Sequence, residues 1–408
     1  MLFGASQDFN AGDWHWFDSD WSEVRTRILS MSIYLDHAAT TPMIEPAIDA
    51  MQRALRKIGN PSSLHTDGRA TRKDVEEARE VIAQALGCQA SEVIFTGSGT
   101  EANNSAIKGL FWSAPDKNLI VVSAIEHHAV LDPAHWLVEH EGAELIEIPV
   151  TNAGVIDCDF LSALVAARGD EIALISVMSA NNETGVIQPI NTVVEIAGAI
   201  PVHTDAVQSF MKVPLNFAGL GLFAMTISAH KVGGPLGIGA LILRKAFEMP
   251  ALLHGGGQER EIRSGTLNAP SIVAFAAAVR ENSYSAERVL SLRHSFENGI
   301  RKVAPLAEVN GRDAQRLPGI INVTFPGTQA DFLLLLMDGK KVSCSTGAAC
   351  TAGVHRPSHV LMAMGRDDIG ATSSLRFSLG ANTTAEDIEY TLSVIPEVIE
   401  MAKAANSL

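Results

Sequence analysis

Residues 93–110 read VIFTGSGTEANNSAIKGL. Val93–Phe95 is a short apolar run typical of a buried strand, and Glu101–Leu110 has the character of a helix. Between them lies a glycine-rich turn, residues 97–100, of the kind that ends one element before the next begins. The stretch therefore predicts a strand, a tight turn and a helix in succession, which is the repeating unit of α/β proteins.

The same alternation continues on both sides of this stretch. A helix is expected at Val75–Leu86, where Gly87 ends it. Further strands are expected at Leu119–Ser123, Glu144–Val150, Ile172–Met178, Val202–Thr204, Met225–Ser228 and Gly239–Leu243. After Asn268 helices at Ala274–Val279 and Ala286–Val303 precede strands near Ile320–Phe325 and Ser374–Ser378. The pattern predicts an α/β fold, with a mostly parallel sheet in a large domain and a smaller α+β domain.

The composition narrows the class of protein. The 408 residues are 47% hydrophobic and 19% charged, which excludes wholesale disorder and allows two or three domains. The net charge of −15 argues against a nucleic acid as the primary ligand. No apolar run is long enough to span a membrane. The four cysteines, at 88, 158, 344 and 350, contain no CxxC pair, so we expect no metal site and a cytoplasmic location.

Residues 1–30 differ from the rest of the chain. They hold three of the five tryptophans among several aspartates, and they resemble neither a secretory signal nor a transit peptide. They are either a short aromatic and acidic appendage or an artefact upstream of a natural start at Met31. The second interpretation is favoured, because the regular pattern begins at Met31.

Three motifs follow strands and suit a flat, phosphorylated cofactor. The turn before Glu101 exposes backbone N–H groups that can bind a phosphate, although it can also be an ordinary tight turn. Lys231, at the end of an apolar strand, can form a Schiff base with a carbonyl group if burial lowers its pKa. Asp205 can hold a pyridinium N–H, or it can simply cap a helix. On each motif alone, the structural alternatives stay open.

Four more residues are candidates on weaker grounds. Asn182 can bond a ring substituent or shape a turn. His127 can stack on a flat cofactor and act as a catalytic acid or base, or it can simply start a helix. Cys350 lies in a small-residue segment where it can act as a nucleophile or be a buried thiol. Arg376 can clamp a carboxylate or form a structural ion pair.

Taken in order, these motifs resemble those of the cysteine desulfurases, which belong to the class V aminotransferase group of fold-type-I enzymes that use pyridoxal 5′-phosphate (PLP). The resemblance runs from Tyr34–Pro42 to the C-terminal helix and is strongest at His230-Lys231, at Arg263–Thr266 and around Cys350. It implies a large PLP-binding domain at 41–286. It also implies a small domain formed by 31–40 and 287–408 that carries the catalytic cysteine.

The resemblance implies a role for each candidate. Lys231 would carry PLP and act as the base, and Cys350 would take the sulfur of L-cysteine as a persulfide, releasing L-alanine. The expected PLP-binding residues are Lys231, Gly99, Thr100, His127, Asn182, Asp205, Gln208, Ser228, His230 and, from the neighbouring subunit of a homodimer, Thr266. Asn182 and Arg376 would hold the substrate carboxylate. The sulfur would pass to an iron–sulfur scaffold or another acceptor protein.

The sequence departs from the family pattern at two positions, and two other functions compete with that of a cysteine desulfurase. Gly233 stands where an aromatic residue is frequent in the family, and Ala229 where glycine is frequent. Cys344 is an additional thiol that has no role in catalysis, relays sulfur, or forms a disulfide under oxidation. One rival is another PLP enzyme on the same scaffold, such as an aminotransferase, a selenocysteine lyase or a β-eliminating lyase. The other is a sulfur-assembly scaffold or regulator without activity.

Overall fold

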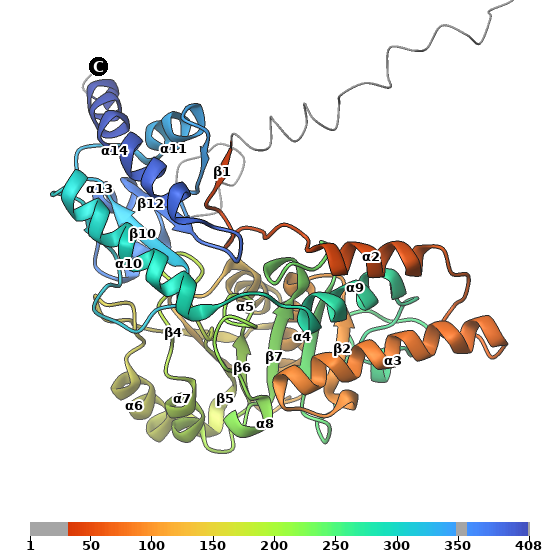
Figure 1. Cartoon of the computed structure of the whole chain (residues 1–408). Helices are drawn as coiled ribbons and strands as arrows, with labels where there is room; N and C mark the ends of the chain where they lie inside the picture. The colour runs from red at the N-terminus through yellow and green to blue at the C-terminus, as the bar shows by residue number, and fades with distance from the viewer. Residues whose placement is uncertain (1–31, 348–356, 407–408) are drawn as a thin grey trace, which may run out of the picture.

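The computed structural model describes residues 32–347 and 357–406. Its main feature is a seven-stranded sheet (Figure 1). In spatial order the strands are β2 (Val93–Thr96), β8 (Gly239–Leu243), β7 (Ala224–Ser228), β6 (Val202–Asp205), β5 (Ile172–Ser176), β3 (Leu119–Ser123) and β4 (Glu144–Ile148). From β7 to β4 all neighbours pair in parallel, whereas β8 is antiparallel to both β7 and β2. The predicted α/β fold with a mostly parallel sheet is confirmed.

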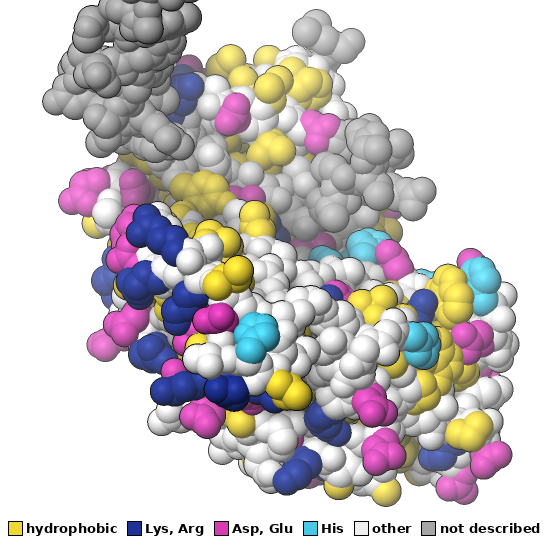
Figure 2. All heavy atoms as spheres, turned by 90° about the vertical axis from the view of Figure 1, so that its right-hand side faces the viewer, with side chains coloured by type: hydrophobic (Ala, Val, Ile, Leu, Met, Phe, Trp, Pro, Cys, Tyr) yellow, Lys and Arg dark blue, Asp and Glu magenta, His cyan; other side chains and the backbone are white. Residues whose placement is uncertain are grey.

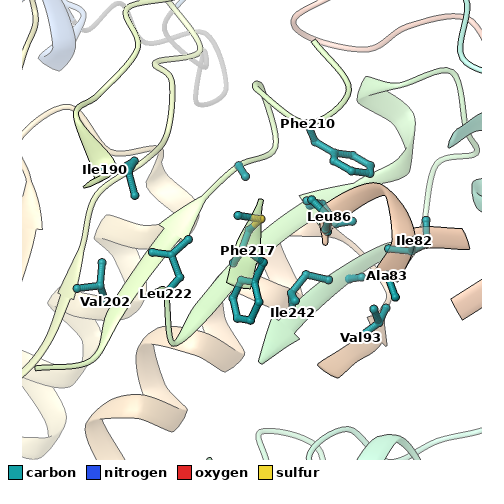
Figure 3. Packing of buried hydrophobic residues seen from close by; sticks show 14 of the residues in the cluster. Ile82, Ala83, Leu86, Val93, Ile190, Val202, Phe210, Phe217, Leu222 and Ile242 are labelled. Carbon is teal, nitrogen blue, oxygen red and sulfur yellow. The ribbon is translucent and has the colours of Figure 1, made fainter. Parts of the chain in front are cut away.

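Helices cover both faces of this sheet because the strands are apolar on both faces. Val93 and Phe95 of β2 belong to one buried cluster, while Ile94, which points the other way, belongs to another. Figure 3 shows the first cluster, in which Ile82 and Leu86 pack near the sheet residue Ile242. The helices of this part of the chain are α2 (Glu45–Leu55), α3 (Thr66–Leu86), α4 (Gly99–Trp112), α5 (His128–Glu141), α6 (Cys158–Arg168), α7 (Ile190–Ala197), α8 (Phe217–Leu220) and α9 (Ala269–Arg280).

A second, smaller unit has its own sheet and its own core. The three-stranded sheet has the order β12 (Ser374–Ser378), β10 (Ile320–Thr324) and β9 (Glu308–Val309), and β1 (Ile33–Tyr34) pairs separately with β11 (Val342–Ser343). Its core joins Leu35 to residues between Val289 and Ala402. The helices here are α10 (Ala286–Val303), α11 (Ala330–Gly339), α12 (His359–Ala363), α13 (Asp368–Ala371) and α14 (Ala385–Asn406). The domain limits inferred from the sequence stay a prediction.

The clearest difference from the expected elements is the start of α3. The apolar pattern predicts a helix from Val75, but the helix begins at Thr66, where the His65 ring accepts a hydrogen bond from the backbone of Gly68. The added turns carry mainly charged and polar residues and therefore give no apolar period. Conversely, β4 and β5 end at Ile148 and Ser176, two residues earlier than expected.

The surface near α2 and α3 carries exposed apolar side chains. In Figure 2, which faces the right-hand side of Figure 1, Lys and Arg gather toward one edge and hydrophobic side chains form separate patches. Leu55, at the end of α2, is 63% exposed, and Ile58 and Leu64, in the connection between the two helices, are 84% and 80% exposed. Within the described part of the chain, no helix is long and apolar enough to cross a membrane.

Candidate active site

A cavity of about 600 Å³ lies at the carboxyl ends of the parallel strands. Open α/β sheets bind their ligands at this edge, because the loops that leave the strands converge there. The cavity collects most of the residues singled out in the sequence. Those that line it are Gly99, Thr100, His127, Asn182, Asp205, Gln208, Ser228, His230, Lys231 and Arg376.

Lys231 follows β7 in a short 3₁₀ turn, Ala229–Lys231. Its Nζ donates to the carbonyl oxygens of Ala38 and Ala39, both at 2.7 Å. Burial, together with the charge of Arg376, lowers the pKa of Lys231 to about 8, against the opposing effect of Asp205 and Asp36. An amine with this pKa is partly neutral near pH 7.5 and can therefore act as a nucleophile or a base.

Asp205 is the last residue of β6 and is 6% exposed. Its Oδ1 accepts from the backbone N–H of Val207 at 2.9 Å, and its Oδ2 accepts from Nδ2 of Asn103 at 2.6 Å. Asn103 lies on α4 and was not predicted from the sequence. Its Oδ1 is buried without a hydrogen-bond partner among the described residues. The pair therefore presents a fixed carboxylate that can hold an N–H cation.

The first turn of α4 forms a cradle for an anion. Ser98 caps the helix by accepting from the N–H of Glu101 at 3.0 Å, and the first N–H groups of a helix have no intrahelical partner. A side chain at Gly99 would place Cβ 3.1 Å from Val207 and 3.3 Å from Ser228. These neighbours would have to move by a few tenths of an ångström to admit a side chain, so glycine fits this position best. The site suits a phosphate group, as the turn predicts.

Two histidines stand beside this cradle in their neutral form. Burial, with the charges of Lys231 and Lys212, lowers the pKa of His230 to about 4, and its Nδ1 lies 3.2 Å from the hydroxyl of Thr40. Burial also lowers the pKa of His127. His127 Nδ1 accepts from the N–H of Ala129 at 3.0 Å, which places the proton on Nε2. His127 can therefore donate its Nε2–H to a bound group, and His230 can donate in the tautomer in which its Nδ1 accepts from the Thr40 hydroxyl.

The facing wall of the cavity is made by the small unit and by the segment after β1. Arg376 in β12 donates from Nη2 to Oδ1 of Asp36 at 2.7 Å and from Nη1 to the carbonyl oxygen of Asn182 at 3.0 Å. Its Nε is buried without a partner among the described residues. A guanidinium that lines the cavity and is fixed by two hydrogen bonds is a suitable partner for a carboxylate. Asp36 is a further residue that sequence reasoning missed.

One of the expected residues does not line this cavity, and another is not among the described residues. Thr266 is exposed and does not line it, although Arg263 in the same segment pairs with Glu101 of α4 at 2.7 Å. Cys350 lies outside the described residues. The chain on either side of it is fixed at the cavity, since Ser345 exchanges backbone hydrogen bonds with Arg376. On the other side, the hydroxyl of Ser358 donates to Oε2 of Glu183 at 2.6 Å.

The remaining cysteines do not form a reactive cluster. Cys344 is 8% exposed and packs in the core of the small unit, where burial raises its pKa to about 12. Burial also raises the pKa of Cys88 to about 12, and the pKa of Cys158 is raised as well. Across residues 32–347 and 357–406 no group of His, Cys, Asp and Glu side chains could hold a metal ion.

Comparison with known proteins gives a consistent result over the length of the chain. Residues 33–391 match the model of the aminotransferase class-V family. The IscS-like cysteine desulfurase of Mycobacterium tuberculosis is 46% identical over 386 residues, which cover 91% of this chain and 97% of that protein. The cysteine desulfurase IscS of Dictyoglomus turgidum is 43% identical, covering 91% and 95%.

Solved structures show the same similarity in three dimensions. A structure described as a NifS-like protein superposes with a TM-score of 0.84 at 35% identity, covering 91% of this chain and 100% of that one. A structure of SspA in complex with cysteine has a TM-score of 0.78 at 32% identity, covering 86% and 100%.

Proposed function

The chain belongs to the aminotransferase class-V family, and we propose that it is a cysteine desulfurase that converts L-cysteine to L-alanine and transfers the sulfur to Cys350. The observation that carries the proposal is the pairing of Lys231 and Arg376 across one cavity. A partly neutral amine lies on one wall, and a guanidinium fixed by Asp36 lies on the other. An amino-acid substrate needs the amine to remove its α-proton and the guanidinium to bind its carboxylate.

PLP fits the donor set of the sheet wall. The cradle at Gly99 and Thr100, with the side chains of Ser228 and His230, would hold its phosphate. Asp205 would hold the ring nitrogen, Gln208 the ring oxygen, and His127 would stack on the ring, while Lys231 would bind it covalently. Thr266 of a neighbouring subunit would complete the phosphate site. Bound there, PLP supplies an electron sink for charge that develops on the substrate α-carbon.

Residues of the chain itself carry out the other steps of the reaction. Arg376, steadied by Asp36, receives the substrate carboxylate together with Asn182. Lys231, whose pKa of about 8 leaves it able to accept a proton, removes the α-proton of L-cysteine. The Cys350 thiolate then attacks the substrate sulfur, and the electrons of the carbon–sulfur bond stay with carbon. Protonation of that fragment gives L-alanine, and the sulfur remains as a persulfide on Cys350.

The oligomeric state, the sulfur acceptor and the cellular location are also part of the proposal. We expect a homodimer, in agreement with the exposed Leu55, Ile58 and Leu64 and with the exposed position of Thr266 outside its own cavity. The persulfide would pass to an iron–sulfur scaffold or another sulfur-acceptor protein. A reducing cytoplasm suits the four cysteines, which form no CxxC pair.

The test compares the PLP-loaded protein with Cys350→Ser, using L-cysteine and a thiol reductant. Wild type should release alanine and sulfide in equal amounts. The variant should lose both products, while L-cysteine still changes the visible absorbance of the cofactor. Pyruvate in place of alanine, or activity that survives the substitution, would indicate a lyase and remove Cys350 from the reaction. A protein that stays colourless after PLP is added would support the inactive scaffold instead.

A further inference from the structure

Lys212 is a partly buried amine that the proposed reaction does not use. It lies four residues after Gln208, at the end of a turn in which Phe210 N bonds Ala206 O at 2.9 Å. Met211, directly before it, has a φ of 59°, a left-handed conformation that non-glycine residues rarely adopt. This backbone brings the Lys212 Nζ back to Oε1 of Gln208 at 3.3 Å. Strain of this kind is often retained where it serves a site.

The contact fixes which way the Gln208 amide points. Its Nε2 donates to the carbonyl oxygen of Ala38 at 2.9 Å, and its Oε1 accepts from Lys212. If the amide rotated by half a turn, its NH₂ group would face an ammonium group and its oxygen would face a carbonyl oxygen. The contact with the carbonyl oxygen would then be repulsive in either protonation state of Lys212, and the contact with Lys212 would be repulsive while the amine is charged, because an ammonium group has donors only. Since Nε2 carries two hydrogens, one remains for an acceptor in the cavity.

The charged and titratable groups that interact with Lys212 lie on both walls of the cavity. Lys231 and Arg376 face it as cations, and His37 and His230 feel its charge in turn. Burial and the two cations lower the pKa of Lys212 to about 7, and no carboxylate is among the groups that shift it. Asp205 and Asp36 act on Lys231 instead. The charged form of Lys212 is therefore stabilised here by an uncharged acceptor, the Oε1 atom of Gln208.

We propose that Lys212 is a positioning residue that holds the Gln208 amide with its N–H toward the ring oxygen of PLP. The inference rests on the proposed PLP site, but not on the identity of the substrate. An N–H donor stabilises the ionised form of a ring oxygen, whereas an amide oxygen turned toward it would destabilise that form. Loss of the donor makes the ring oxygen more basic and therefore raises the pKa of the bound cofactor.

The experiment is a pH titration of the visible absorbance of the PLP-loaded protein without substrate. Lys212→Met should raise the midpoint by about one pH unit, a change of about tenfold in proton affinity, if the donor is lost. Lys212→Arg keeps a donor and should stay near the wild-type midpoint. Lys245→Met is the matched control, because Lys245 also donates to a glutamine, Gln89, at 3.5 Å, but it is exposed and does not line the cavity.

A double-mutant cycle with Gln208→Ala separates positioning from a direct effect of charge. If Lys212 acts through Gln208, Lys212→Met should no longer move the midpoint once Gln208 is alanine. An equal shift in both backgrounds, or no shift in Lys212→Met alone, would overturn the inference. Circular dichroism checks folding, and Lys212→Gln, whose shorter side chain does not reach Gln208, replaces the methionine variant if that one fails to fold.

The result is separable from the test of the proposed function. A wild-type protein that binds PLP but forms no alanine would refute the desulfurase, while the titration would still decide the role of Lys212. A protein that does not bind PLP at all would refute both.

Discussion

The two walls of the cavity are built by different means. On the sheet wall, Asp205 ends a strand, and His127 and Lys231 each follow one within a few residues. On the facing wall, Asp36 and Arg376 meet although 340 residues separate them in the chain. The sheet wall therefore takes its side chains from the ends of buried parallel strands, whereas the facing wall takes Arg376 from within the buried strand β12 and joins it to Asp36 by a polar pair between distant segments.

The difference suggests that the sheet wall binds the cofactor and the facing wall binds the substrate. Strands that are buried along their whole length hold the side chains at their ends rigidly, as a cofactor needs. The segment after β1 is tied to the sheet wall by hydrogen bonds, among them those from Lys231 and Gln208 to Ala38. We expect substitutions on the sheet wall to impair the cofactor. Substitutions on the facing wall should impair mainly substrate binding, apart from the effect of the Arg376 charge on the pKa of Lys231.

The largest effect is expected for Lys231→Ala on the sheet wall. The variant loses the covalent link to PLP and the base, so alanine formation should fall by at least about 10⁴-fold. Borohydride should no longer fix the cofactor to the protein, whereas Lys245→Ala should behave as wild type in both assays. Alanine formation within about tenfold of wild type would show that another base acts, and the proposed division of the site would then be wrong.

The pH dependence of PLP capture links the two walls. Only the neutral amine of Lys231 reacts with PLP, and its pKa of about 8 means that the neutral form grows as the pH rises through that value. With the cofactor removed, the capture rate should rise about 25-fold between about pH 6.5 and about pH 8.5 and then level off. Stopped-flow absorbance gives the rate.

Removing the charge of Arg376 tests whether the facing wall contributes to the low pKa of Lys231. Arg376 lowers the pKa of Lys231, so Arg376→Met should move the midpoint of PLP capture upward. A wild-type midpoint near the ordinary lysine pKa of about 10.4 would contradict the assigned burial of Lys231.

The sheet wall was also the more predictable from sequence. Apolar runs that end in polar residues mark both strand ends and candidate ligands, so Asp205 and Lys231 could be found locally. Asp36 and Asn103 could not, because their importance comes from partners far away in the chain, Arg376 and Asp205. The start of α3 was missed because its first turns face solvent and have no apolar period.

A smaller effect is expected for Asp36→Ala on the facing wall. Arg376 would lose a charge-assisted hydrogen bond that fixes its guanidinium, so KM for L-cysteine should rise about tenfold. Asp36→Asn keeps an acceptor at the same place and should recover most of the affinity. Glu397→Ala, which breaks the surface pair with Lys340, is the control. The absorbance of bound PLP should not change, and a loss of cofactor in Asp36→Ala would contradict the division between the walls.

The smallest effect is expected for Cys344→Ser, although Cys344 stands near Cys350 in the sequence. Cys344 packs among apolar side chains, and burial raises its pKa to about 12, so the thiolate that a sulfur relay needs is scarce at neutral pH. The rate of alanine formation and the sensitivity to oxidants should stay within about twofold of wild type, with a loss of stability of about 1 kcal/mol for the buried hydroxyl. Cys158→Ser, at a partly exposed thiol, serves as the control.

A relay by Cys344 would instead make Cys344→Ser release sulfide more slowly, and a disulfide between Cys344 and Cys350 would make Cys344→Ser resistant to oxidants. Either result would show that the facing wall opens far enough to expose a core residue, which its fixed contacts at Ser345 and Arg376 argue against.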